Sequence, residues 1–127
     1  MFKNLVVTAI LGMSAVILGA FGAHALKETL SPEALQSFET AVRYQMYQVL
    51  VLLFVNIYEG FTEKQKNTLS YLLFLGILFF SGSIYCIQLT SITAKSIWFV
   101  TPLGGLFFII GWLSMIVIFV KKQKKIK

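Results

Sequence analysis

The residues best suited to chemistry in this sequence are one histidine and several polar side chains that lie within or beside long apolar stretches. They are His24, Gln45, Gln48, Ser81, Ser83, Tyr85 and Thr101. Polar groups in such surroundings often mark a binding site or a pathway, because leaving them unsatisfied in hydrocarbon is unfavourable. These seven residues are therefore the candidate ligand-binding residues, provided that the fold brings them together.

The groups that would complete a catalytic or metal site are missing from the apolar stretches. All five acidic residues are glutamates outside these stretches, so no carboxylate is available to orient His24 as a base. A transition-metal site needs three or four ligands, and only His24 and the single Cys86 are candidates. No glycine-rich phosphate loop is present. We expect no enzyme, no catalytic residues, no metal and no cofactor.

Two interpretations of the polar residues stay open. They could form an interhelical hydrogen-bond network that fixes the helix register, at about 0.6 kcal/mol per bond. They could instead line a small, outward-open polar pocket for an ion, a solute or a lipid head group. The network interpretation predicts a hydrogen bond between His24 and at least one of Gln45, Gln48, Ser83 or Thr101.

The composition is that of an integral membrane protein. Of 127 residues, 57% are hydrophobic and only 13% are charged, far from the usage of a soluble domain. Apolar segments at about 5–26, 44–58, 69–89 and 97–120 are near the length that crosses a bilayer, the second being the weakest. We expect an all-α bundle of four transmembrane helices forming one membrane domain over residues 1–127, with cleavage of the first segment as a signal peptide as the alternative.

The polar connection between the first two segments contains the start of a helix. Ser31, Pro32 and Glu33 supply a capping hydroxyl, a first-position proline and a first-turn acid, so a helix should begin at Pro32. Apolar residues then recur at helical spacing at Leu35, Phe38, Val42 and Met46. We therefore predict an amphipathic helix at the outer interface between spans one and two.

Small residues at helical spacing predict where helices pack closely. In the first span Ala15, Gly19 and Ala23 form one stripe, with Gly12 and Gly22 beside it. In the later spans Gly82, Gly104 and Gly105 are the corresponding candidates.

The basic residues indicate orientation. The net charge is +6, and five lysines crowd into the tail at residues 121–127, which suits anionic lipid head groups rather than nucleic acid. With four spans, eight basic residues fall on the side of the termini and three on the other. This bias predicts that both termini lie in the cytoplasm.

Four ordered motifs resemble a known family. They are LGAFGAH at 18–24, YQMYQ at 44–48, FSGSIY at 80–85, and TPLGG at 101–105 with a later GW at 111–112. Together they resemble the YwdK/YgdD family of small bacterial membrane proteins, whose eukaryotic relatives are called transmembrane protein 256. The resemblance implies a multi-pass inner-membrane protein and supplies no established activity. Members often carry histidine at the position of Gln48, so a two-histidine metal or haem site is not expected here.

These observations favour a non-enzymatic structural, assembly or regulatory membrane component. The alternative is a minimal oligomeric transporter or channel for a small solute, ion or lipid that uses the polar pocket. Expected partners are membrane lipids, further copies of the chain or another membrane protein.

Overall fold

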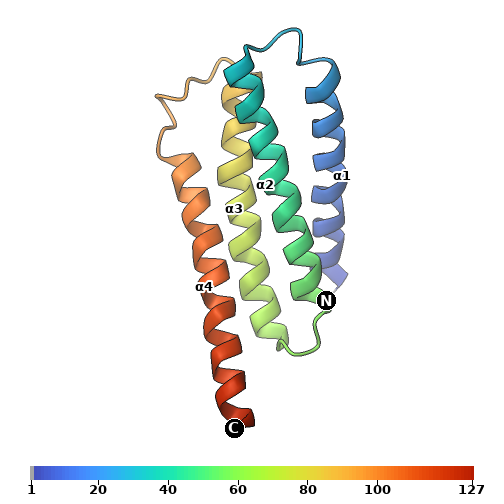
Figure 1. The fold of residues 1–127 in the computed structure, drawn as a ribbon, viewed down its shortest axis with the longest axis vertical. Helices are drawn as coiled ribbons and strands as arrows, with labels where there is room; N and C mark the ends of the chain where they lie inside the picture. The colour runs from blue at the N-terminus through green and yellow to red at the C-terminus, as the bar shows by residue number, and fades with distance from the viewer. Residues whose placement is uncertain (1) are drawn as a thin grey trace.

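Residues 2–127 of the computed structural model form a bundle of four long helices (Figure 1). They are α1 (Phe2–His24), α2 (Pro32–Ile57), α3 (Glu63–Leu89) and α4 (Val100–Ile126). Both termini lie at one end of the bundle, and the α1–α2 and α3–α4 connections lie at the other. The all-α expectation is confirmed.

Helix α2 begins where the sequence predicts, and it is one continuous helix. The backbone N–H of Ala34 donates to Ser31 Oγ at 3.2 Å, with Pro32 in the first turn. Residues 33–57 contain no glycine or proline, so nothing interrupts the helix before Ile57. The amphipathic turns predicted between spans one and two are therefore the first half of α2 and not an additional helix.

Three of the four helices are apolar enough to cross a membrane. Windows of 18 residues within them reach mean hydropathies of 2.2 in α1, 2.0 in α3 and 2.5 in α4, whereas α2 falls short. Three of the polar residues that lower the hydropathy of α2, Gln45, Gln48 and Asn56, are at least 94% buried inside the bundle, whereas the charged Glu33, Glu39 and Arg43 are exposed. Composition alone thus confirms three spans.

The helices pack in chain order, α1 on α2, α2 on α3 and α3 on α4. In the α1–α2 pair, glycines of α1 lie opposite larger side chains of α2. A Cβ on Gly12 would lie 3.3 Å from Val49, and one on Gly19 would lie 3.4 Å from Val42. The two helices are therefore an antiparallel pair in which valine side chains of α2 pack against glycines of α1.

The α3–α4 pair approaches more closely. The Gly104 backbone lies against the Phe80 backbone, so that a Cβ on Gly104 would come within 2.7 Å of Phe80 Cα. Further along, the Phe108 ring covers Gly76. Buried residues of α4 recur in steps of four and three, at Gly104, Phe108, Gly111 and Met115. This spacing is that of a helix seam.

Only some of the residues expected to pack helices together lie in close helix contacts. Ala15 and Gly22 are buried, and Gly104 lies in the closest contact of the bundle. Ala23, however, is exposed, because the buried stripe of α1 runs through Gly22 instead. A Cβ on Gly82 or Gly105 would meet only ordinary contacts near 4 Å, so these two glycines do not hold helices together.

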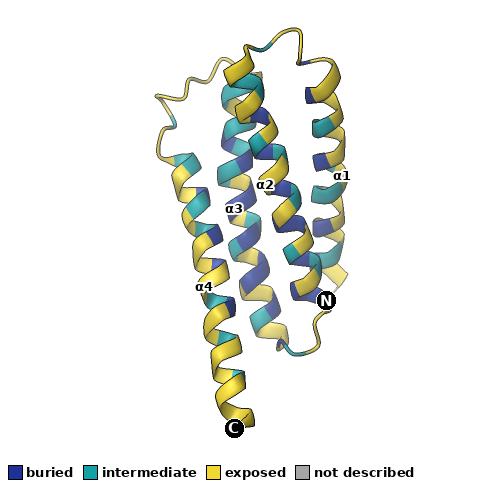
Figure 2. Ribbon diagram, viewed as in Figure 1, coloured by how far each residue is buried: buried dark blue, intermediate teal, exposed yellow. Residues whose placement is uncertain are grey.

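The outward faces of the bundle are apolar, as Figure 2 shows by the exposed colour along α1 and α4. Exposed large apolar residues in the middle turns include Ile10, Met13, Val16, Ile17, Leu106, Ile109, Leu113 and Ile116. A surface of this kind is solvated by lipid chains rather than by water. At its end α4 continues through the lysine-rich tail, which is helical to Ile126 and extends past the other helices.

Candidate functional site

The polar residues expected to form one site instead fall into separate groups. Gln45 is the centre of the first, between α1, α2 and α3. Its Nε2 donates to the Leu11 carbonyl and to Ser14 Oγ, both at 2.8 Å, and its Oε1 accepts from the Tyr85 hydroxyl at 2.7 Å. Gln45 is 2% exposed, so this group is a satisfied structural connection across three helices.

The serines of α3 make connections of their own. Ser81 Oγ donates to the Ala41 carbonyl at 2.7 Å and so joins α3 to α2. Ser83 and Thr101 share a hydrogen bond between their hydroxyls that joins α3 to α4. Each pair holds two neighbouring helices in register, as the network interpretation expects.

His24 lies apart from these groups. It is the last residue of α1, it is exposed, and no hydrogen bond within residues 2–127 joins its ring to Gln45, Gln48, Ser83 or Thr101. The expected contact is therefore absent. The cause is that α1 ends at His24, which leaves the ring beside the α1–α2 connection and not within the bundle.

Gln48 faces a different groove of the bundle, toward α4. The side chain is 6% exposed, and its Oε1 is a buried acceptor without a hydrogen-bond partner in residues 2–127. Since nearly all buried polar side chains in proteins find a partner, an unsatisfied carbonyl at this depth requires an explanation.

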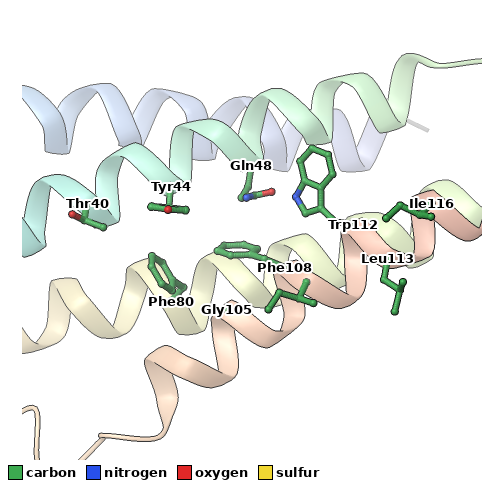
Figure 3. A pocket seen from close by; sticks show the side chains of 10 residues that line it. Thr40, Tyr44, Gln48, Phe80, Gly105, Phe108, Trp112, Leu113 and Ile116 are labelled. Carbon is green, nitrogen blue, oxygen red and sulfur yellow. The ribbon is translucent and has the colours of Figure 1, made fainter.

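Gln48 lines a cavity of about 660 Å³ between α2 and α4 (Figure 3). Residues of α2, α3 and α4 surround this α2–α4 cavity: Thr40, Tyr44, Gln48, Phe80, Gly105, Phe108, Ile109, Trp112, Leu113 and Ile116. Figure 3 shows Gln48 between the two facing helices with the Trp112 indole beside it. The volume lies within the range of small-molecule sites.

A second hollow of about 490 Å³ continues the cavity along the same two helices. It is lined by Leu50, Val51, Phe54, Trp112, Met115, Ile116 and Phe119. Because Trp112 and Ile116 line both spaces, the two form one groove, which we call the α2–α4 groove. The first part of this groove holds polar side chains, and the second is lined by apolar residues apart from the Trp112 indole nitrogen.

Sequence reasoning missed this site apart from Gln48 and Gly105. A signal was present, because Thr40, Tyr44 and Gln48 recur every four residues and so share one face of α2. On the opposite wall, Trp112 was visible only as part of the GW motif at 111–112, and Phe108 had no distinguishing pattern among the apolar residues of its span.

A polar cluster at the end near the termini was also missed. Asn4 Nδ2 donates to Asn56 Oδ1 at 3.1 Å and to Asn67 Oδ1 at 2.9 Å, and Asn56 Nδ2 donates to Ser70 Oγ at 2.8 Å. These bonds join α1, α2 and α3, and the buried members are satisfied. The cluster is therefore structural, with no group left to bind a ligand.

Comparison with known proteins fits this architecture. A family model described as "Protein of unknown function (DUF423)" matches residues 18–105, which is more than half of the chain. The chain belongs to this family. The matched residues include Tyr44, Gln48, Phe80 and Gly105 of the cavity and end before Trp112.

Staphylococcal relatives are called UPF0382 membrane proteins. The protein of Staphylococcus saprophyticus is 45% identical over 89% of this chain and 92% of its own length. Those of Staphylococcus haemolyticus and Staphylococcus aureus are 43% identical over 89% of this chain and 91% of their own lengths. No solved structure matches. The chain is thus a multi-pass membrane protein, and the resemblance to YwdK/YgdD-type proteins is confirmed.

Proposed function

We propose that this DUF423 protein is a non-enzymatic membrane component that holds a membrane-soluble amphiphile in the α2–α4 groove. The observation that carries the proposal is the buried Gln48 Oε1, which has no donor in residues 2–127 and borders a cavity of about 660 Å³. A protein that gained nothing from this carbonyl would be more stable with an apolar side chain there. Such a conflict with stability is typical of functional sites.

The proposal includes four membrane spans. Helix α2 has 26 residues, enough to cross about 30 Å of hydrocarbon at ~1.5 Å per residue. Gln45, Gln48 and Asn56 are buried and so would not meet lipid. With α2 as a span, the groove opens sideways into the bilayer, where only molecules dissolved in the membrane reach it.

A transporter with an outward polar pocket is supported less well. Such a pocket would need the free polar atoms of Gln45, Ser81 and Ser83. These atoms already form hydrogen bonds with groups on neighbouring helices. The groove, in contrast, has unpartnered polar atoms and space. Binding therefore fits the geometry better than passage.

A photoreactive probe tests the proposal. A fatty alcohol with a diazirine in its chain is added to vesicles of phosphatidylcholine that contain the protein, and adducts are mapped by mass spectrometry after illumination. We expect adducts to concentrate on the α4 residues that line the groove, such as Ile109 and Ile116. Equal labelling of all exposed apolar faces, including that of α1, would contradict the proposal.

Substitutions at two glycines supply a matched control. Gly105→Leu places a side chain in the cavity, and its Cβ would contact only the Phe80 ring at 4.0 Å. Gly82→Leu makes the same change at another open glycine, on the other side of α3. We expect Gly105→Leu to remove the groove adducts and Gly82→Leu to leave them unchanged.

A further inference from the structure

Three polar groups that line the α2–α4 cavity have no hydrogen-bond partner within residues 2–127. They are the carboxamide of Gln48, whose Oε1 is buried, and two groups of more exposed residues, the hydroxyl of Tyr44 (40% exposed) and the indole N–H of Trp112 (48% exposed). The fourth polar lining residue, Thr40, donates to the Gln36 carbonyl at 2.9 Å and is satisfied. The three free groups lie near the middle turns of α2 and α4, where lipid chains offer no hydrogen bonds.

The chemistry of these groups defines what would satisfy them. A carboxamide carries both a donor and an acceptor, and rotation about its last torsion can present either one to the cavity. The indole N–H only donates, whereas a phenol does both. An occupant that satisfies all three therefore carries hydroxyl or carbonyl oxygens at its polar end.

The walls of the cavity favour a flat ring at that end. Tyr44, Phe80, Phe108 and Trp112 contribute four aromatic rings. The Tyr44 and Phe80 centroids are 5.2 Å apart, and those of Phe80 and Phe108 are 5.7 Å apart. Aromatic surfaces spaced in this way pack against a further ring by offset or edge contacts.

The rest of the groove favours an apolar chain attached to the ring. Beyond Trp112 the groove continues for a further 490 Å³ between residues such as Leu50, Phe54 and Phe119. No side-chain nitrogen or oxygen lines that part except the Trp112 indole. A ring beside Gln48 would thus carry its chain toward the end of the bundle that holds the termini.

We infer that the α2–α4 groove binds an isoprenoid quinone or its quinol, with the oxygens of the ring at Gln48, Tyr44 and Trp112 and the chain along the apolar part. This inference rests on the proposed function and names its ligand class. A quinone carbonyl accepts from the carboxamide N–H, and a quinol hydroxyl donates to the carboxamide oxygen. One glutamine therefore serves both oxidation states.

Other membrane occupants satisfy the site less well. A phospholipid chain has no polar atom at this depth. A second copy that packed through the middle turns of its α1 or α4 would bring no polar side chain to Gln48 except Trp112, because those exposed turns are otherwise apolar. The unpartnered carboxamide thus distinguishes a ring with oxygens from both.

Trp112 provides the signal for a direct test. The chain has two tryptophans, so Trp98→Phe leaves Trp112 as the only one. The probe is a naphthoquinone with a two-isoprene chain, added to phosphatidylcholine vesicles that contain this variant. Quinones quench tryptophan fluorescence, and we expect a saturable component of quenching above the linear part that collisions in the bilayer produce.

Variants assign the saturable component to the groove. Gln48→Met keeps the length and volume of the side chain but removes its polar atoms, and we expect the midpoint to rise about tenfold, which corresponds to ~1.4 kcal/mol. Gly105→Leu should abolish saturation. Gln36→Met makes the same change at an exposed glutamine outside the cavity and should leave the midpoint unchanged.

The outcomes separate this inference from the proposed function. Groove adducts of the fatty alcohol without saturable quenching, or an unchanged midpoint in folded Gln48→Met, would overturn the quinone inference and leave the proposed function standing. If neither probe locates the groove, both are wrong. Saturable quenching that depends on Gln48 and Gly105 supports both.

Discussion

At the scale of single residues, the clearest contrast lies between two glutamines of α2 that are three positions apart. Gln45 makes three hydrogen bonds with α1 and α3, whereas the Gln48 carbonyl makes none within residues 2–127. Successive residues turn by about 100° around a helix axis, so the two side chains point about 60° apart. That difference is enough to send them into different grooves of the bundle.

This contrast predicts that replacement by methionine changes the stability of the protein in opposite directions at the two glutamines. Gln45→Met removes three bonds at ~0.6 kcal/mol each and should destabilise the protein by about 2 kcal/mol. Gln48→Met removes an unsatisfied buried carbonyl and should stabilise the empty protein by about 1 kcal/mol. The measurement is thermal unfolding in detergent without added lipid, followed by circular dichroism.

Each variant is the control for the other, because side-chain length and helix propensity change equally. A lower melting temperature for Gln48→Met would show that its carboxamide has a partner within the folded chain. The groove would then lose its free polar group, and the proposed function would lose the observation on which it rests.

The sequence showed which polar residues connect helices more reliably than it showed where their side chains point. The polar residues of the spans were visible, and Gln45, Ser81, Ser83, Tyr85 and Thr101 do connect helices. Their division into separate pairs depends on helix rotation and on partners that are backbone carbonyls, such as those of Leu11 and Ala41. A carbonyl acceptor has no signature in the sequence.

At the scale of elements, the start of α2 was predictable and its extent was not. The start at Pro32 follows from a cap at Ser31 whose effect is local. Hydropathy began the span at Tyr44, because the charged Glu33, Glu39 and Arg43 precede it. The span was also the weakest of the four, because averaging counts Gln45, Gln48 and Asn56 as though lipid surrounded them. They lie inside the bundle, and burial of this kind depends on neighbouring helices that an average along one helix ignores.

Adjacent glycines of α4 give a test of helix packing. Gly104→Ala would place a Cβ within 2.7 Å of Phe80 Cα and 2.8 Å of the Phe79 carbonyl carbon. Since backbone atoms cannot rotate away, α3 and α4 must separate, and we expect a loss of about 1–3 kcal/mol in the free energy of unfolding. Thermal unfolding in detergent measures this loss.

Gly105→Ala is the matched control for Gly104→Ala. Its Cβ would lie 4.0 Å from the Phe80 ring, an ordinary contact, and alanine favours a helix by ~1 kcal/mol over glycine. The variant should be as stable as the wild type or slightly more stable. Similar melting temperatures for the two variants would mean that α3 and α4 are not in close contact at Gly104.

At the scale of the whole molecule, the groove follows from the order of packing. Each helix packs on its neighbour in the chain, so α4 rests on α3 without closing against α2. The gap that remains is lined by aromatic side chains of both helices. Sequence spacing could suggest which face of each helix packs, but the groove depends on the angle between pairs, which no single helix encodes.

The last prediction concerns the direction of the molecule in the membrane. Both termini lie at one end of the bundle, together with Lys3, Lys64 and the lysine-rich end of α4. Basic residues are retained on the cytoplasmic side, so we expect this end to face the cytoplasm and the α1–α2 connection to face outward.

The test uses single cysteines in a Cys86→Ser background: Glu28→Cys in the α1–α2 connection and Gln123→Cys near the end of α4, both exposed positions. An impermeant maleimide should label Glu28→Cys in intact cells, and should label Gln123→Cys only after the membrane is permeabilised. The reverse labelling pattern would mean that the termini face outward, which would place the apolar part of the groove nearer the outer leaflet.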